Sequence, residues 1–209
     1  MQNRIGSCKR KTKETDIELT INLDGQGKNQ IDTGIPFFDH MLDGFARHGL
    51  FDLNVKVRGD LEVDSHHTIE DTGIVLGQAI AQALGDKAGI KRYGYFVLPM
   101  DEVLALGAVD LSGRPYLNFQ ADFTVPVLGT MDTEMVREFF YAVSYSAAIE
   151  PAPLRSLMQG IIIIMAEALF KAFGKALDMA VSEEPRIKEV WSTKGSLNGV
   201  TEGVRRNYV

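Results

Sequence analysis

The chain has 209 residues, of which 45% are hydrophobic and 24% are charged, and its formal net charge is −6. This much apolar material supports one sizeable core or two small ones. The acidic balance argues against nucleic-acid and anionic-membrane partners and leaves room only for a local basic pocket that binds a phosphate. Residues 1–15 lack the apolar core of a signal peptide, no apolar run is long enough to span a bilayer, and the single Cys8 suits a reducing compartment. We therefore expect a cytoplasmic protein.

The first half of the chain predicts strands followed by two helices. Its polar and apolar residues predict, in chain order, a strand over 16–24, a helix over 37–49, two strands within 51–63 and a helix over 68–84. The strand over 16–24 alternates polar and apolar residues, which is typical of a half-buried strand. The first helix repeats apolar residues at helical spacing and ends at Gly49, a common terminator.

The second half repeats this order of elements. It predicts strands over 103–113 and 115–123, a helix from about 132 and a helix over 165–180. Each shorter helix carries a Phe-Phe pair (37–38 and 139–140), and each longer helix has a glutamate near its start (Glu70 and Glu167). This pattern indicates an internal duplication. We predict an α+β fold of two duplicated halves, each a mainly antiparallel sheet with two helices on one face. The predicted divisions are 1–92, 93–190 and a tail over 191–209.

All four histidines lie between His40 and His67. If a helix begins near His66, then His66 and Glu70 share one face at i, i+4, and so do His67 and Asp71. Imidazole and carboxylate ligands together suit Mn²⁺, Fe²⁺ or Zn²⁺.

Two aspartates next to the histidines, Asp39 and Asp64, are candidates for orienting the imidazole rings. The alternative is a solvated helix start in which Asp64 or Ser65 caps the helix and the histidines are surface residues. The spacing alone leaves both interpretations open.

Candidate anion ligands lie outside the histidine region. Arg114 follows a predicted strand in a turn, Arg92 lies in a loop, and Ser192 and Lys194 lie in the segment STKG. Hydroxyls, a glycine and a lysine together suit a phosphate, and arginine adds bidentate contacts. Each of these residues alone is more often a surface group in a turn.

Several motifs in fixed order resemble the imidazoleglycerol-phosphate dehydratase family of histidine biosynthesis. They are TKET (12–15), TGIPFFDHML (33–42), RHG (47–49), GDLEVDSHHTIEDTG (59–73), VDLSGRPYL (109–117) and STKGSL (192–197). The resemblance covers almost the whole chain and implies a hydro-lyase that converts imidazole glycerol phosphate to imidazole acetol phosphate. It also implies two Mn²⁺ ions per site and a homo-oligomeric shell of 24 subunits with sites where subunits meet.

The resemblance also implies roles for individual residues. The implied metal ligands are His40, His66, His67, Glu70 and, from the second half, Glu167. Glu14 and His48 would contact the glycerol part of the substrate, with Glu14 as the first candidate for acid–base catalysis. The implied phosphate ligands are Arg92, Arg114, Ser192 and Lys194.

Residues 149–165 depart from the family pattern. The family normally has a second Leu-His-Ile and, after a short loop, Gly-x-Asn-x-His-His-x-x-Glu. Glu167 is retained, but Ile163 and Ile164 stand where the two histidines belong, and Ala152 stands near the place of the Leu-His histidine. Loss of imidazole ligands weakens metal binding, so we expect little or no activity from the chain as written.

A frameshifted reading accounts for this departure. With suitable synonymous codons, Ile-Glu-Pro-Ala (149–152) encodes Met-Asn-Leu-His after one base is removed, and Gly-Ile-Ile-Ile-Ile (160–164) contains Asn-Asn-His-His in another frame. The alternative is a divergent paralogue in which residues 161–164 pack as a buried strand or helix entrance. Prolines 151 and 153 would also cost a strand its ladder hydrogen bonds.

Two other functional classes stay open at this point. One is a non-catalytic subunit that retains the fold and the phosphate pocket. The other is a metal hydrolase, which the pattern HHTIED alone would also fit.

Overall fold

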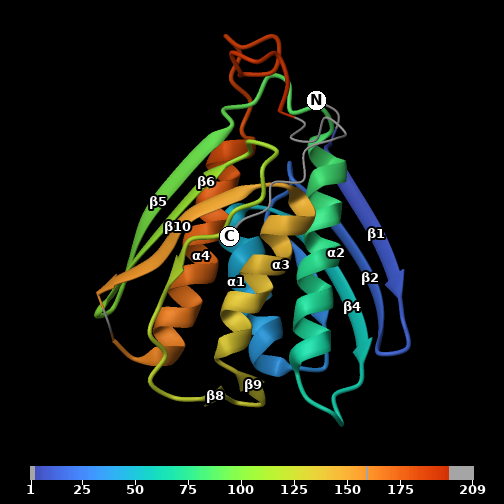
Figure 1. Ribbon diagram of the computed structural model, residues 1–209, viewed down its shortest axis with the longest axis vertical. Helices are drawn as coiled ribbons and strands as arrows, with labels where there is room; N and C mark the ends of the chain where they lie inside the picture. The colour runs from blue at the N-terminus through green and yellow to red at the C-terminus, as the bar shows by residue number, and fades with distance from the viewer. Residues whose placement is uncertain (1–2, 159, 198–209) are drawn as a thin grey trace, which may run out of the picture.

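The computed structural model describes residues 3–158 and 160–197 and contains two sheets with helices between them (Figure 1). The first half contains β1 (Ile5–Lys11), β2 (Thr15–Asn22), β3 (Asn29–Asp32), α1 (Pro36–Gly49), β4 (Asp52–Gly59) and α2 (His66–Leu84). The second half contains β5 (Tyr93–Met100), β6 (Val103–Asp110), β7 (Phe119–Gln120), β8 (Val127–Leu128), β9 (Met131–Asp132), α3 (Glu134–Ala147), β10 (Glu150–Met158) and α4 (Ile162–Val181). Among the described helices, none is both long and apolar enough to cross a bilayer.

The two sheets have the same topology. The first has the order β1-β2-β4-β3 and the second the order β5-β6-β10-β7. In each sheet, the first three strands in this order pair antiparallel with one another. The fourth strand pairs parallel with the third, as β3 does with β4 and β7 with β10. Gly6 on β1 and Gly94 on β5 are equivalent too, because an ideal Cβ on either would lie 1.8 Å from a helix carbonyl oxygen, that of Ala79 or of Ala176. The predicted α+β fold of two duplicated halves is confirmed.

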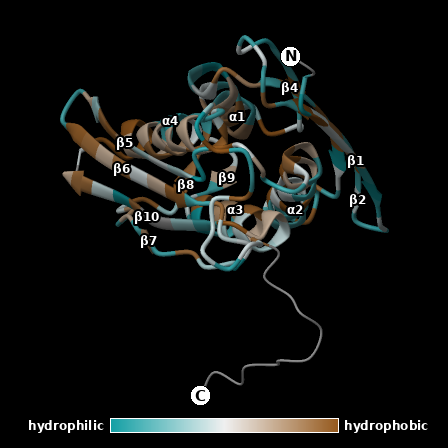
Figure 2. Cartoon of the chain, turned by 90° about the horizontal axis from the view of Figure 1, so that it is seen from above, coloured by the Kyte–Doolittle hydropathy of each residue, from teal (hydrophilic) through white to brown (hydrophobic). Residues whose placement is uncertain are grey.

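The helices form the layer between the sheets (Figure 2). α1 and α2 cover the first sheet, α4 covers the second, and α3 reaches the second sheet where Phe140 stacks on Phe119 of β7. Across the middle, α1 packs along α4 and α2 packs along α3. All four helices begin at the lower end of the molecule in Figure 1. Their positive dipole ends therefore point to one side.

The two halves meet through the predicted Phe-Phe pairs. Phe38 and Phe139 are fully buried, with ring centroids 5.3 Å apart in an edge-to-face arrangement. Phe139 also stacks on Phe170 of α4 at 5.1 Å. Aromatic pairs of this geometry contribute beyond the area that they bury. One core thus joins both halves.

Some predicted elements differ from the structure. Residues 61–63 form a turn, so the second strand predicted within 51–63 is wrong, and the strand predicted over 115–123 shortens to β7. α2 and α4 begin two and three residues earlier than predicted. β10 forms despite its two prolines, but its pairing with β6 shifts register between Pro151 and Leu154, where the ladder was expected to weaken. The predicted divisions at 92 and 190 stay predictions, and residues 198–209 of the tail lie outside the described chain.

Replacing Gly73 of α2 with alanine is expected to destabilise the fold by about 1–3 kcal/mol through overpacking. An ideal Cβ at Gly73 lies 2.8 Å from the carbonyl oxygen of Phe139 on α3. The matched control is Gly44→Ala on α1, where the Cβ meets only the Lys171 side chain, at 3.7 Å, and helix propensity should stabilise by about 0.5–1 kcal/mol. Urea denaturation at equal protein concentration measures the free energy of unfolding of both variants. Equal changes in that free energy would contradict the close packing of α2 on α3.

Candidate active site

The candidate metal ligands lie in the first two turns of α1, α2 and α4, at the end where the helices begin. We call this the metal end. On α2, His66 Nε2 lies 3.3 Å from Glu70 Oε2, and both side chains are nearly half exposed. The predicted i, i+4 pair therefore forms. A cavity of about 770 Å³ borders His66, which is a volume suited to a small molecule.

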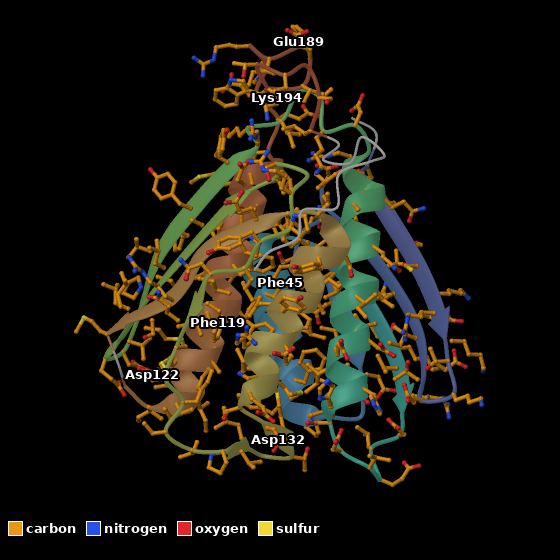
Figure 3. All side chains as sticks on the ribbon, viewed as in Figure 1. Phe45, Phe119, Asp122, Asp132, Glu189 and Lys194 are labelled. Atoms are coloured by element: carbon orange, nitrogen blue, oxygen red, sulfur yellow. The ribbon has the colours of Figure 1, made fainter. Side chains whose placement is uncertain are left out.

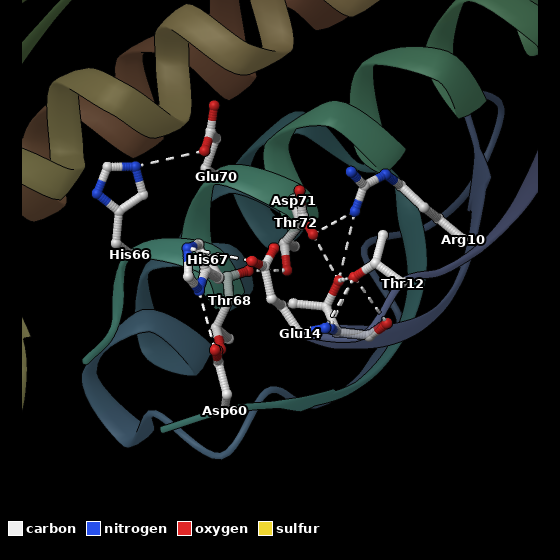
Figure 4. Close-up of polar contacts among 11 residues, drawn as sticks. Arg10, Thr12, Glu14, Asp60, His66, His67, Thr68, Glu70, Asp71 and Thr72 are labelled. Atoms are coloured by element: carbon white, nitrogen blue, oxygen red, sulfur yellow. Dashed lines mark hydrogen bonds and ion pairs between the residues drawn. The ribbon is translucent and has the colours of Figure 1, made fainter. Parts of the chain in front are cut away.

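His67 has a different partner from the one that its spacing indicated. Its Nδ1 lies 3.0 Å from Asp60 Oδ2, and its Nε2 lies 3.9 Å from Glu14 Oε1 (Figure 4). The predicted pair of His67 and Asp71 is wrong, because Asp71 is buried and faces the hairpin between β1 and β2. Sequence reasoning missed Asp60, although it lies within the segment 51–63 that precedes His67.

Asp71 holds the hairpin that carries Glu14. Its carboxylate accepts hydrogen bonds from Thr15 Oγ1 and from the guanidinium of Arg10. Within the hairpin, Thr12 Oγ1 accepts the backbone N–H groups of Glu14 and Thr15. The half-exposed Glu14 side chain is thereby fixed beside α2 (Figure 4).

The two aspartates proposed to orient imidazoles bind elsewhere. Asp39 Oδ1 accepts the backbone N–H of Thr33 at 2.9 Å and its hydroxyl at 2.5 Å. Asp64 Oδ1 accepts the backbone N–H of His66 at 2.7 Å. The expected roles of both are wrong, because their side chains fix the entrances of α1 and α2 instead. The capping by Asp64 agrees with that part of the surface-helix alternative.

His40 of α1 meets Glu167 of α4, so the packing of the two halves creates a second imidazole–carboxylate pair. His40 Nε2 lies 3.5 Å from Glu167 Oε2, and Lys171 Nζ lies 2.6 Å from Glu167 Oε1. Burial raises the pKa of Glu167, but Lys171 and then His40 lower it, and the net shift is downward. Sequence reasoning missed Lys171, although the i, i+4 spacing from Glu167 was a signal for it.

His48 lies further along α1, and the charge of Lys171 affects its pKa as well. Partial burial first, and then the positive charge of Lys171, lower the pKa of His48. A neutral imidazole at this position can both donate and accept a hydrogen bond. The structure does not bring His48 to Glu14, whose contact is His67 on α2.

The entrance of α4 contains the unusual isoleucines. Ile161 and Ile163 are exposed, at 60% and 47%, whereas Ile162 and Ile164 pack partly against the core. The interpretation of a buried entrance is therefore wrong, because two of the four isoleucines are exposed and the other two are only partly buried. Ile163 precedes Glu167 by one turn, which is the relation that His66 has to Glu70.

The missing cap of α4 comes from another element. Ile161 has no side-chain cap, and its backbone N–H donates to Glu102 Oε1 at 2.8 Å from the turn between β5 and β6. This hydrogen bond lowers the pKa of Glu102. A carboxylate at this position also suits the positive end of the helix dipole.

The candidate phosphate ligands gather at the opposite end, which we call the anion end. Arg92 binds Asp110 through two hydrogen bonds, of 2.7 and 3.1 Å, and donates to the carbonyl of Trp191 at 2.9 Å. This contact brings the segment with Ser192 and Lys194 to Arg92. Figure 3 shows Lys194 far from Asp132, which lies at the metal end.

Arg114 joins the same end through the neighbouring strand. Its guanidinium lies 3.8 Å from Glu150, which pairs with Asp110 across β10 and β6. Ser192 Oγ accepts the backbone N–H of Lys194 at 3.2 Å, which closes the STKG turn. The four predicted phosphate ligands thus share one end of the second sheet.

The two ends are separated by the length of α2. This helix has 19 residues and is therefore about 28 Å long. His66 lies at its first residue, and Arg92 lies eight residues beyond its last. Within one chain, the imidazole–carboxylate pairs and the phosphate ligands cannot contact one small substrate together.

Comparisons with known proteins identify the family. The imidazoleglycerol-phosphate dehydratase profile matches residues 33–177. The chain is 60% identical over 195 residues to the imidazoleglycerol-phosphate dehydratase of Lachnoclostridium phytofermentans, which covers 93% of this chain and 99% of that protein. It belongs to the imidazoleglycerol-phosphate dehydratase family.

Other members of this family are similar in sequence and in structure. The dehydratase of Acetivibrio thermocellus is 58% identical over 188 residues, covering 90% of this chain and 96% of its own. The crystal structure of the Staphylococcus aureus enzyme matches with a TM-score of 0.78 and 39% identity, over 86% of this chain and 99% of that one. The Pyrococcus furiosus structure also has a TM-score of 0.78, at 33% identity, over 91% and 100% of the two chains.

Replacing Asp60 with asparagine is expected to lower the pKa of His67 toward its ordinary value of 6.5. The hydrogen bond to Asp60 is the main cause of the raised pKa of His67, with burial opposing it and Glu14 adding to it. The hydrogen bond stabilises the fold fully at a pH below the pKa of His67 in the unfolded chain. This stabilisation is lost as the pH rises through the higher pKa of His67 in the folded chain. NMR titration of the metal-free protein measures the shift, with Asp43→Asn on α1 as the control. An unchanged His67 pKa would contradict the assignment.

Proposed function

We propose that the chain catalyses the dehydration of imidazole glycerol phosphate to imidazole acetol phosphate in histidine biosynthesis, as a hydro-lyase. Membership of the family carries this assignment, and it favours neither the non-catalytic alternative nor a hydrolase. The observation that supports it most directly is the meeting of His40 with Glu167 across the two halves, at the same end of the molecule as the His66–Glu70 pair. The single free Cys8 suits the reducing cytoplasm, where we propose the enzyme works.

The ligand atoms at the metal end are of the types that bind Mn²⁺. One chain alone, however, brings too few of them together to hold the ion. Each pair supplies an imidazole nitrogen and a carboxylate oxygen, which suit this ion. In the described residues, however, no three side chains of His, Cys, Asp or Glu converge to hold an ion. We propose that His66 with Glu70 and His40 with Glu167 each hold part of a Mn²⁺ site, and that His67 of a neighbouring subunit helps to complete it. Bound Mn²⁺ would supply positive charge that makes the substrate imidazole a stronger acid.

The side chains at the two ends then have separate tasks. The anion end binds the substrate's phosphate through Arg92, Arg114, Ser192 and Lys194. Glu14, fixed by the Asp71 contacts, would remove the proton from the carbon next to the one that bears the leaving hydroxyl. The C–O bond breaks as the C=C bond forms, the hydroxyl leaves with a proton as water, and the resulting enol tautomerises to the ketone. His48, whose pKa is lowered, stays neutral near pH 7 and can hydrogen-bond a substrate hydroxyl. No electrons are transferred, so the reaction needs no redox cofactor.

The separation of the two ends supports a homo-oligomer with shared sites. A further support is the outer face of the second sheet, where Tyr95 and Val97 of β5 pair in register with Ala108 and Leu106 of β6. Tyr95 is 66% exposed. The equivalent face of the first sheet carries polar groups such as Lys9, Glu18 and Lys56. An exposed apolar face of this kind marks an interaction site, and we propose that it packs against another copy in a shell of 24 subunits.

Introducing a charge at Tyr95 is expected to reduce the mass of the assembly. Tyr95→Glu would place a carboxylate in the apolar face, which is unfavourable to bury. Sedimentation velocity measures the mass, and Thr20→Glu on the outer face of the first sheet is the matched control. The proposed contact fails if both variants retain the mass of the unmodified protein.

Restoring the second-half histidines is expected to raise turnover on the order of 10- to 100-fold. The relevant change is Ile163→His with Ile164→His, together with Ala152→His in β10, where the Ala152 side chain lies outside those described. The assay follows product formation with saturating Mn²⁺ and substrate. Full turnover by the unmodified chain would show that the histidines are dispensable. Independent sequencing of the coding DNA for residues 145–167 tests the frameshift hypothesis directly.

A further inference from the structure

Lys87 is a buried cation that the proposed reaction does not use. It lies between α2 and β5 and is only 6% exposed. Its Nζ donates to the backbone oxygen of Leu111 at 3.3 Å. Lysine is almost never this buried without a partner, so its position needs a reason. Leu111 directly follows Asp110, the residue that binds Arg92 at the anion end.

The backbone holds Lys87 and Arg92 in the same unusual conformation. Their φ angles are 63° and 66°, in the left-handed region that side chains other than glycine rarely adopt. Such strained backbone persists only where the surrounding structure enforces it. Backbone hydrogen bonds supply that constraint: the N–H of Lys87 donates to the Leu84 carbonyl at 3.0 Å, and the Arg92 carbonyl accepts the N–H of Leu111 at 3.1 Å. The carbonyl of Leu111 in turn accepts Lys87 Nζ.

The charges at the anion end explain what this arrangement can do. Arg92 is paired with Asp110, and Arg114 lies near Glu150, so each arginine has an acidic partner that cancels much of its attraction for a phosphate. Lys87 makes no ion pair with any described residue within 4 Å. Burial lowers the pKa of Lys87, the charge of Asp110 raises it, and Arg92 lowers it. Because Lys87 is buried, its charge acts on a bound phosphate through a medium of lower dielectric constant than water.

We propose that Lys87 is a positioning residue that fixes Arg92 through Leu111 and supplies net positive charge to the phosphate site. The acid-paired arginines orient the hydrogen bonds, and Lys87 provides attraction that these pairs lack. This role rests on the proposed function, which assigns the substrate's phosphate to the anion end.

The test measures binding of inorganic phosphate to the full assembled chain by isothermal titration calorimetry. Lys87→Met should weaken binding on the order of tenfold, the effect of one charge about 10 Å away at an effective dielectric constant near 20. Lys87→Arg should retain most of the affinity. Lys56→Met, on the exposed face of the first sheet, is the matched control and should change nothing.

A second variant separates charge from folding. Lys87→Gln can still donate to the Leu111 carbonyl but carries no charge, so it should lose affinity as Lys87→Met does. Loss of the charge should also make phosphate binding less sensitive to salt, which a merely loosened pocket would not do. Full affinity with Lys87→Gln overturns the proposal even where Lys87→Met does not fold.

The arginines distinguish this proposal from the proposed function. If Arg114→Met loses phosphate binding and Lys87→Gln retains it, the role of Lys87 is wrong and the phosphate site stands. If Arg92→Met, Arg114→Met and Lys87→Gln all bind phosphate as the unmodified chain does, the phosphate site is wrong as well.

Discussion

The packing of α1 on α4 is the contact on which the candidate site depends. Gly49 and Gly174 allow the two helix backbones to approach, since an ideal Cβ on Gly174 would lie 2.5 Å from the carbonyl oxygen of Phe45. Only at this separation can His40, from the first half, reach Glu167, from the second. The chemistry therefore belongs to neither half alone. A duplicated fold in which the halves were joined more loosely would retain both sheets and lose this pair.

Parallel packing of the helices gives the molecule two chemically different ends. Carboxylates gather where the helices begin, which suits the positive ends of the helix dipoles. The candidate phosphate ligands lie at the other end, where Arg92 and Arg114 each have an acidic partner. One small substrate cannot span an interval of about 28 Å. The proposed reaction would therefore need a second copy of the chain to bring the two kinds of ligand together.

Sequence patterns predicted the duplication because both halves show the same order of elements and each shorter helix carries a Phe-Phe pair. They predicted the His66–Glu70 pair because both residues lie on one helix, where spacing fixes geometry. They gave the wrong partner for His67 and no prediction for Lys87, because the partners of both residues lie outside their own helix or turn. Asp60 reaches His67 across the turn before α2, and Leu111 reaches Lys87 across 24 residues. No local periodicity contains such contacts, so only the folded arrangement reveals them.

The hydrogen bond from Ile161 to Glu102 has a consequence for which residues can occupy the start of α4. A helix usually begins where its own sequence supplies a polar cap, so replacing the residues around that point tends to move or fray the end. Here the starting point is set by a carboxylate 59 positions earlier in the chain. Apolar residues can therefore occupy the first turn of α4 while Glu167 keeps its place opposite His40.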